Sequence, residues 1–150
     1  MNISAKYHHT NLIAEDWRSL ASFYQQVFGC VPVPPERDFQ GDKLDAGVRI
    51  AGAHLRGVHM RLPGYGDTGP TIEIFNYNLL ENRSKTAVNR PGYGHVAFMV
   101  EDVAGARKAI IQAGGHEFGE IVTLPGGTTT WCYVTDPEGN LIELLQPAAK

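Results

Sequence analysis

The feature that most constrains the fold of this 150-residue chain is an internal repeat, because a pattern that occurs twice must build the same unit twice. Several pairs of identical residues share a separation of 86 positions, among them Tyr7 with Tyr93, His9 with His95, Glu15 with Glu101, Asp16 with Asp102, and Gly29 with Gly115. Residues 70–75 match residues 140–145 in the same order at a separation of 70, so the first copy is 16 residues longer between these landmarks. The sequence therefore predicts a duplicated module, and because the module occurs only twice it does not predict a solenoid.

Each copy is predicted to form a strand, a helix and then further strands. Apolar residues spaced along one helical face predict helices over Trp17–Phe28 and over residues 103–113. Asp16 and Asp102 precede them as N-cap residues, whose carboxylates accept backbone N–H bonds. Short apolar runs predict strands at 8–14, 53–62 and 71–77 in the first copy, and at 95–100, 119–124, 129–135 and 140–145 in the second. The prolines after the first helix predict an irregular loop from Pro32 to about residue 52.

Length and composition fit a single ordered domain. A chain of 150 residues predicts one domain, with module one at about 7–78, a polar linker at about 79–91 and module two at about 92–147. A hydrophobic share of 43% with 19% charged residues is typical of a globular protein and excludes wholesale disorder. Cys30 and Cys132 are isolated thiols, so we expect small buried hydrophobic residues rather than a disulfide framework.

The charge balance narrows the class of partner. A net charge of −3 argues against general nucleic-acid binding, because proteins that bind nucleic acids usually contain more basic than acidic residues. The sequence holds no long apolar run that could span a membrane and no apolar segment that resembles a secretory signal at its start. We therefore expect a cytoplasmic protein that acts on a small molecule.

The repeat places the same two residue types at equivalent positions in both copies. A histidine stands at the first strand and a glutamate at the last, which pairs His9 with Glu73 and His95 with Glu143. A glutamate among apolar strand residues is costly to bury without a compensating partner. Two imidazoles and two carboxylates, one of each from each copy, fit a divalent metal ion held between the copies.

A structural role is the alternative for each of these residues. A single strand histidine or glutamate is more often a surface or core residue than a ligand, but two coincidences at equivalent positions favour ligation. His8 neighbours His9 and is expected to point to the opposite face of the strand. The other three histidines have no counterpart in the second copy and are expected to be surface, core or substrate-lining residues: His54, His59 and His116.

On these motifs the chain resembles the vicinal oxygen chelate superfamily, which includes glyoxalase I, methylmalonyl-CoA epimerase, extradiol dioxygenases and the bleomycin and fosfomycin resistance proteins. The resemblance covers about residues 7–147 and is carried by His9 with the helix start at 16–24, by residues 94–98, and by the segment from Asp136 to Leu144. It implies an α+β fold of two tandem βαβββ modules that form an open barrel around a metal site. It also implies that the metal ligands are His9, Glu73, His95 and Glu143.

The resemblance further implies an enzyme that transfers a proton next to a metal-chelated carbonyl, as a lyase or isomerase similar to lactoylglutathione lyase or methylmalonyl-CoA epimerase. Glu143 and Glu73 are the candidate catalytic carboxylates, with Glu143 favoured as the base. The expected cofactor is a divalent ion of Ni, Co, Mn, Fe or Zn, and the expected assembly is a homodimer. An extradiol-type dioxygenase and a non-catalytic binding protein of the bleomycin-resistance type stay open as alternatives.

Overall fold

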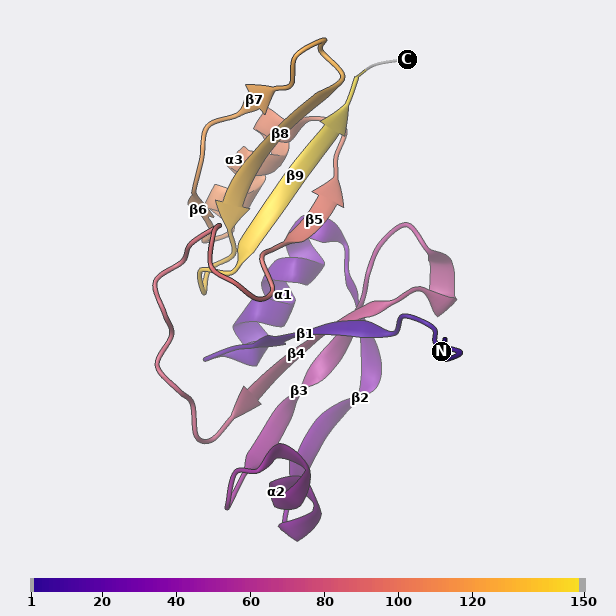
Figure 1. Ribbon diagram of the computed structural model, residues 1–150, viewed down its shortest axis with the longest axis vertical. Coiled ribbons are helices and arrows are strands. Elements are labelled where there is room, and N and C mark those ends of the chain that lie inside the picture. The colour runs from indigo at the N-terminus through magenta and orange to yellow at the C-terminus, as the bar shows by residue number, and fades with distance from the viewer. Residues whose placement is uncertain (1, 149–150) are drawn as a thin grey trace. The chain divides into compact units, whose positions relative to one another are not determined.

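The computed structural model describes residues 2–148, and the chain divides into two compact units, Met1–Asn82 (unit 1) and Arg83–Lys150 (unit 2). Unit 1 contains β1 (His9–Ile13), α1 (Trp17–Phe28), β2 (Val31–Gln40), α2 (Asp42–Val48), β3 (His54–Arg61), the 3-10 turn η1 (Gly66–Thr68) and β4 (Thr71–Tyr77). Unit 2 contains β5 (Val96–Met99), α3 (Val103–Gln112), β6 (His116–Glu117), β7 (Val122–Thr123), β8 (Thr129–Thr135) and β9 (Leu141–Pro147) (Figure 1).

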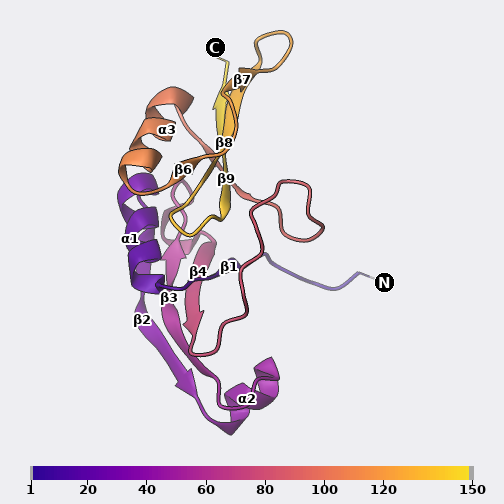
Figure 2. The same ribbon diagram turned by 90° about the vertical axis from the view of Figure 1, so that its left-hand side faces the viewer.

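The sheet of unit 1 has the strand order β1-β4-β3-β2. The outer strand β1 runs parallel to β4, while β3 is antiparallel to both β4 and β2. Helix α1 lies along one face of this sheet (Figure 2) and contacts β4; its Phe23 and Tyr24 are buried, as are the alternate strand residues Ile72 and Ile74. The opposite face is therefore the one from which Glu73 projects, because neighbouring residues of a strand point to opposite sides.

The sheet of unit 2 repeats this order as β5-β9-β8-β6, and β7 continues the pairing along the same edge of β8. Strand β5 is parallel to β9, as β1 is to β4. Helix α3 covers one face of the sheet (Figure 2), and its Val103 and Ile110 are fully buried together with Ile142 and Leu144. The α+β class and the duplicated βαβββ module are thus confirmed, while the grouping of both modules into one domain of 150 residues stays a prediction.

Both predicted helix starts are confirmed by their caps. The Asp16 carboxylate accepts hydrogen bonds from the backbone N–H groups of Arg18 and Ser19, and Asp102 accepts one from Ala104. The hydroxyl of Ser19 also donates to Asp16, and these hydrogen bonds lower the pKa of the Asp16 carboxyl. Helix α1 ends at Gly29, which adopts a left-handed conformation with φ of 69°.

The predicted loop after the first helix is wrong. Residues Val31–Gln40 form β2 and residues Asp42–Val48 form α2, which lies at the far end of the β2–β3 hairpin (Figure 1). Strand β2 is the outer strand of its sheet, and an outer strand tolerates prolines because one edge needs no N–H donors. The pairing register shifts between Val33 and Arg37, so Pro34 and Pro35 fall in the irregular part of the ladder.

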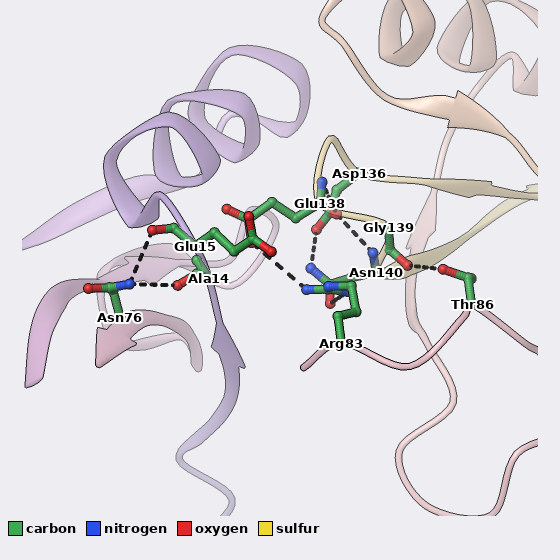
Figure 3. A network of polar contacts seen from close by, with 9 residues as sticks. All are labelled: Ala14, Glu15, Asn76, Arg83, Thr86, Asp136, Glu138, Gly139 and Asn140. Atoms are coloured by element: carbon green, nitrogen blue, oxygen red, sulfur yellow. Dashed lines mark hydrogen bonds and ion pairs between the residues drawn. The ribbon is translucent and has the colours of Figure 1, made fainter. Parts of the chain in front are cut away.

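The turn before β9 is built around Asp136, whose side chain is fully buried. Its carboxylate accepts hydrogen bonds from the backbone N–H groups of Glu138 and Asn140 at 3.0 and 2.9 Å, and from the Asn140 amide at 2.7 Å. Figure 3 shows that the linker contacts this turn, since Thr86 donates to the Gly139 carbonyl and Arg83 donates to Asn140. The turn therefore fixes where β9, which carries Glu143, begins.

A similar contact closes the end of β1 in unit 1. The Asn76 side-chain amide on β4 donates to the carbonyl oxygens of Ala14 at 3.0 Å and Glu15 at 3.1 Å (Figure 3). These hydrogen bonds attach the segment between β1 and α1 to the sheet. The strand that carries His9 is therefore fixed both by its pairing with β4 and at its C-terminal end.

The two cysteines are buried free thiols, as predicted. Burial raises the pKa of the Cys30 thiol to about 11 and also raises the pKa of Cys132, which disfavours the reactive thiolate at neutral pH. Within residues 2–148, the helices are too short or too polar to cross a membrane.

Candidate functional site

In unit 1 the strand register brings His9 and Glu73 together. His9 pairs with Thr71 across the parallel β1–β4 ladder, so Glu73 lies two residues further along β4 on the same face. The His9 Nε2 atom is 3.1 Å from Oε2 of Glu73. The Asn11 side-chain amide on the same face of β1 donates to that oxygen at 3.3 Å. Only 13% of the Glu73 side chain is exposed, so its charge needs these partners.

Unit 2 reproduces the same arrangement with the other predicted pair. His95 directly precedes β5, whose residue Ala97 pairs with Glu143 on β9, so histidine and glutamate have the same two-residue stagger as in unit 1. The His95 Nε2 atom is 3.2 Å from Oε2 of Glu143, whose side chain is 19% exposed. The structure therefore brings together each pair that the repeat predicts within its own module.

His59 is a site residue that the sequence comparison of the two copies missed. It lies on β3 directly opposite Glu73, and its Nε2 atom is 2.8 Å from Oε1 of Glu73. Its Nδ1 atom is 2.9 Å from the hydroxyl of the buried Thr71. His9, His59 and Glu73 thus form a group of three side chains whose donor atoms all lie within 4.8 Å of one another.

The repeat could not find His59 because the equivalent position of unit 2 holds a different residue. Tyr133 on β8 lies opposite Glu143, as His59 lies opposite Glu73. The predicted strands contained one indication of His59. Directly opposed residues of antiparallel strands point to the same face, so a histidine on the strand next to Glu73 is a candidate partner. The ring of Tyr133 lies 5.2 Å from that of His95, and burial together with the Glu143 charge raises the pKa of the tyrosine hydroxyl.

The position of His8 differs from its prediction. Strand β1 begins at His9, so the alternation of faces does not extend to His8. The Nδ1 atoms of His8 and His9 are 2.7 Å apart, and the His8 and His59 rings lie 6.2 Å apart. His8 is exposed and lies beside the site instead of on the opposite face.

The remaining histidines lie elsewhere. His54 is at the other end of β3 and forms an ion pair with Asp38, with Nε2 and Oδ1 2.6 Å apart. His116 is exposed on β6, where its neighbour Glu117 binds Arg107. Neither belongs to the His–Glu pairs.

The electrostatics of unit 1 favour a neutral imidazole at His59. Burial lowers its pKa most strongly, the charge of Glu73 acts in the opposite direction, and the positive charge of Arg37 adds to the lowering. A neutral imidazole keeps one ring nitrogen as an acceptor or metal ligand, while its other nitrogen can still donate to a carboxylate.

The donor set of the two pairs fits a divalent metal. Imidazole nitrogen and carboxylate oxygen are the ligands that first-row divalent ions accept. Each histidine already faces its glutamate through Nε2, so each pair presents a nitrogen and an oxygen donor side by side. In unit 1 the donors that could hold an ion are His9 and Glu73, with His59 in contact with Glu73, and in unit 2 they are His95 and Glu143.

The comparisons with known proteins agree with this organisation. The family model of the Glyoxalase/Bleomycin resistance protein/Dioxygenase superfamily matches residues 6–144. A "Probable lactoylglutathione lyase" of Vibrio parahaemolyticus is 40% identical over 86 residues, which cover 55% of this chain and 59% of that protein. A lactoylglutathione lyase of Escherichia coli is 43% identical over 84 residues, which cover 55% of this chain and 60% of the relative. The matched segment thus covers about three fifths of these curated relatives.

Solved structures of low sequence identity share the fold. A glyoxalase family protein of Bacillus cereus superposes with a TM-score of 0.84 at 20% identity and covers 99% of this chain and 97% of that chain. A fosfomycin resistance protein of Listeria monocytogenes, solved with Mn(II) and sulfate, has a TM-score of 0.54 at 20% identity and covers 99% of this chain and 95% of that chain. Because the family model spans nearly the whole sequence and the fold agrees, the chain belongs to the glyoxalase/bleomycin resistance protein/dioxygenase superfamily.

Proposed function

We propose that this protein is a divalent-metal-dependent lyase or isomerase that moves a proton next to a substrate carbonyl, in the manner of lactoylglutathione lyase. The observation that carries the proposal is the pair of equivalent His–Glu contacts, His9 with Glu73 and His95 with Glu143, in a chain of this superfamily. These four residues are proposed as the metal ligands, whether the two modules that supply them belong to one chain or to two.

The proposed metal agrees with the relatives. The Listeria protein of the same fold was solved with Mn(II), and two N and two O donors suit Ni, Co, Mn, Fe or Zn. A bound ion would supply a Lewis acid that stabilises negative charge on a substrate oxygen.

The two glutamates differ in the number of side chains that contact their carboxylates, and we use this difference to propose their roles. Glu73 is contacted by His9, His59 and Asn11, so both of its oxygens are engaged. Glu143 has His95 as its only ion-pair partner within residues 2–148. A carboxylate with fewer contacts is freer to turn toward a substrate proton, as a general base must. We therefore assign proton transfer chiefly to Glu143 and a fixed ligand role to Glu73.

The substrate class is proposed from the relatives. Both curated relatives carry the name lactoylglutathione lyase, which points to a thiol conjugate of a 2-oxoaldehyde. The metal-reconstituted protein is expected to isomerise the hemithioacetal of methylglyoxal and glutathione, measured as formation of the thioester in the ultraviolet. Its turnover of a methylmalonyl thioester is expected to be lower. A rate for the methylmalonyl thioester above that for the hemithioacetal would contradict the substrate assignment but keep the reaction class.

An Fe(II) dioxygenase is the second candidate, favoured by the group of His9, His59 and Glu73. Two histidines and one carboxylate that face one point form the ligand set of many non-haem Fe(II) oxygenases. Against it, a fourth donor from the other predicted pair would occupy coordination space that oxygen and a catechol require. Oxygen uptake with catechol and Fe(II) is therefore expected to be absent, and its appearance would favour this candidate.

We also propose a homodimer, because β1 and β5 are outer strands of their sheets, and an outer strand is an edge at which another chain can pair. Sedimentation velocity at micromolar concentration is expected to give a species of twice the chain mass of 16.4 kDa. A single species at the mass of one chain would refute the dimer without affecting the proposed reaction.

A further inference from the structure

The carboxylate of Glu73 is enclosed by a cluster that the proposed reaction does not explain. His59 contacts Oε1 at 2.8 Å, whereas His9 and Asn11 contact Oε2 at 3.1 and 3.3 Å. The two oxygens of Glu73 therefore have separate sets of partners. The equivalent glutamate of unit 2 lies opposite Tyr133 and Ala97 instead, so this enclosure is a property of unit 1 alone.

The His59 ring is itself held in place. It projects from β3, the strand between β2 and β4, and is buried; it lies 5.8 Å from the ring of Phe75, and its Nδ1 atom contacts the Thr71 hydroxyl at 2.9 Å. An imidazole with both nitrogens engaged and a packed face has little freedom to rotate, so it is a rigid partner for Glu73.

The partners also fix which nitrogen carries the proton. An ionised carboxylate only accepts hydrogen bonds, so the Nε2 atom that faces Glu73 must be the donor in a neutral ring. Nδ1 is then the acceptor, and the Thr71 hydroxyl donates to it. This order of hydrogen bonds runs in one direction, from Thr71 through His59 to Glu73.

We infer that His59 is a positioning residue that, held by Thr71, ties down Oε1 of Glu73 and leaves Oε2 as the oxygen that faces His9. This inference rests on the proposed function, in which Glu73 and His9 are metal ligands. Hydrogen bonds of this kind orient a ligand and fix its coordination, and their loss typically lowers metal affinity by about 10–100-fold. His59 thereby makes Glu73 the fixed carboxylate of the site.

The test compares variants that keep or remove the N–H donor. His59→Leu removes the donor, His59→Gln retains an amide N–H, and Thr71→Val removes the hydroxyl that holds the ring. His54→Leu is the matched control, because His54 is on the same strand and pairs with a carboxylate, Asp38, outside the site. Each protein is checked for folding by circular dichroism, and the metal-free protein is then titrated with Co²⁺, followed by its visible absorption.

His59→Leu is expected to lower Co²⁺ affinity by about 10–100-fold and to change the absorption spectrum, while His59→Gln restores much of the affinity. Thr71→Val is expected to have an intermediate effect, and His54→Leu to bind as the wild type does. Wild-type affinity and spectrum in His59→Leu would overturn the inference while leaving the proposed metal site intact. A loss as complete in His59→Gln as in Glu73→Gln would also overturn it, because His59 would then be a metal ligand.

A second measurement judges the inference without metal. Long-range ¹H–¹⁵N correlation spectra of the metal-free protein report which imidazole nitrogen is protonated. We expect His59 in the Nε2–H form, and an Nδ1–H form would overturn the orientation of Glu73 derived above. If wild-type protein binds no Co²⁺, the proposed function fails, and these spectra still decide whether His59 donates to Glu73.

Discussion

Glu143→Gln is expected to slow turnover of the hemithioacetal by roughly 10²–10⁴-fold at saturating metal, because the amide cannot accept the substrate proton. Glutamine still offers a carbonyl oxygen to the ion, so the loss in kcat should exceed the loss in metal content measured by elemental analysis. Glu73→Gln is the matched variant, since it makes the same chemical change in the other His–Glu pair.

The two variants separate the roles of the glutamates. Glu73→Gln is expected to weaken metal binding and to retain more activity once metal is saturating, because Glu73 is assigned as a fixed ligand. His95→Ala is expected to lose metal outright, since it removes a nitrogen donor. Equal losses of kcat in both glutamine variants would contradict the division between a mobile base and a fixed ligand.

Asp136→Ala is expected to destabilise unit 2 by about 3–4 kcal/mol, because three donors would lose a buried, charged acceptor. The measurement is urea denaturation followed by tryptophan fluorescence, with Trp131 on β8 as a probe in the same sheet. Since the turn sets the start of β9, we also expect weaker metal binding through Glu143.

The matched control for this prediction is Asp102→Ala, which removes an exposed carboxylate that caps α3 and accepts a hydrogen bond from Ala104. Losing an N-cap costs about 1 kcal/mol, so this variant should be clearly less destabilised than Asp136→Ala. Equal destabilisation of the two variants would show that the buried turn contributes no more than an ordinary helix cap.

Local chemistry explains why parts of the fold could be predicted closely. Helix Trp17–Phe28 and strand Thr71–Tyr77 have the predicted bounds, because each combines a clear apolar period with defined ends. Strand β2 could not be predicted, since its stability comes from pairing with β3 and its prolines suppress the local signal. Tertiary pairing thus outweighed local preference at that edge.

The same distinction applies to the site. The pairs His9–Glu73 and His95–Glu143 could be predicted from the repeat, because the repeat identifies equivalent positions without knowledge of the fold. The comparison of the two copies could not identify His59, because its contact with Glu73 depends on the β3–β4 register that places the two residues opposite each other. A comparison of two copies identifies only residues that occur at equivalent positions in both. It therefore cannot identify a residue that makes its contact in one module only.

The measurement that tests the central proposal most directly is solvent-deuterium exchange during turnover. The metal-reconstituted protein is incubated without oxygen in D₂O with the hemithioacetal of methylglyoxal and glutathione, and the thioester product is analysed by NMR and mass spectrometry. Proton transfer by a carboxylate that exchanges with solvent predicts deuterium at the carbon next to the carbonyl, and predicts that Glu143→Gln lowers product formation. Absence of turnover without oxygen, together with oxygen-consuming cleavage of catechols that requires Fe(II), would contradict the proposed reaction.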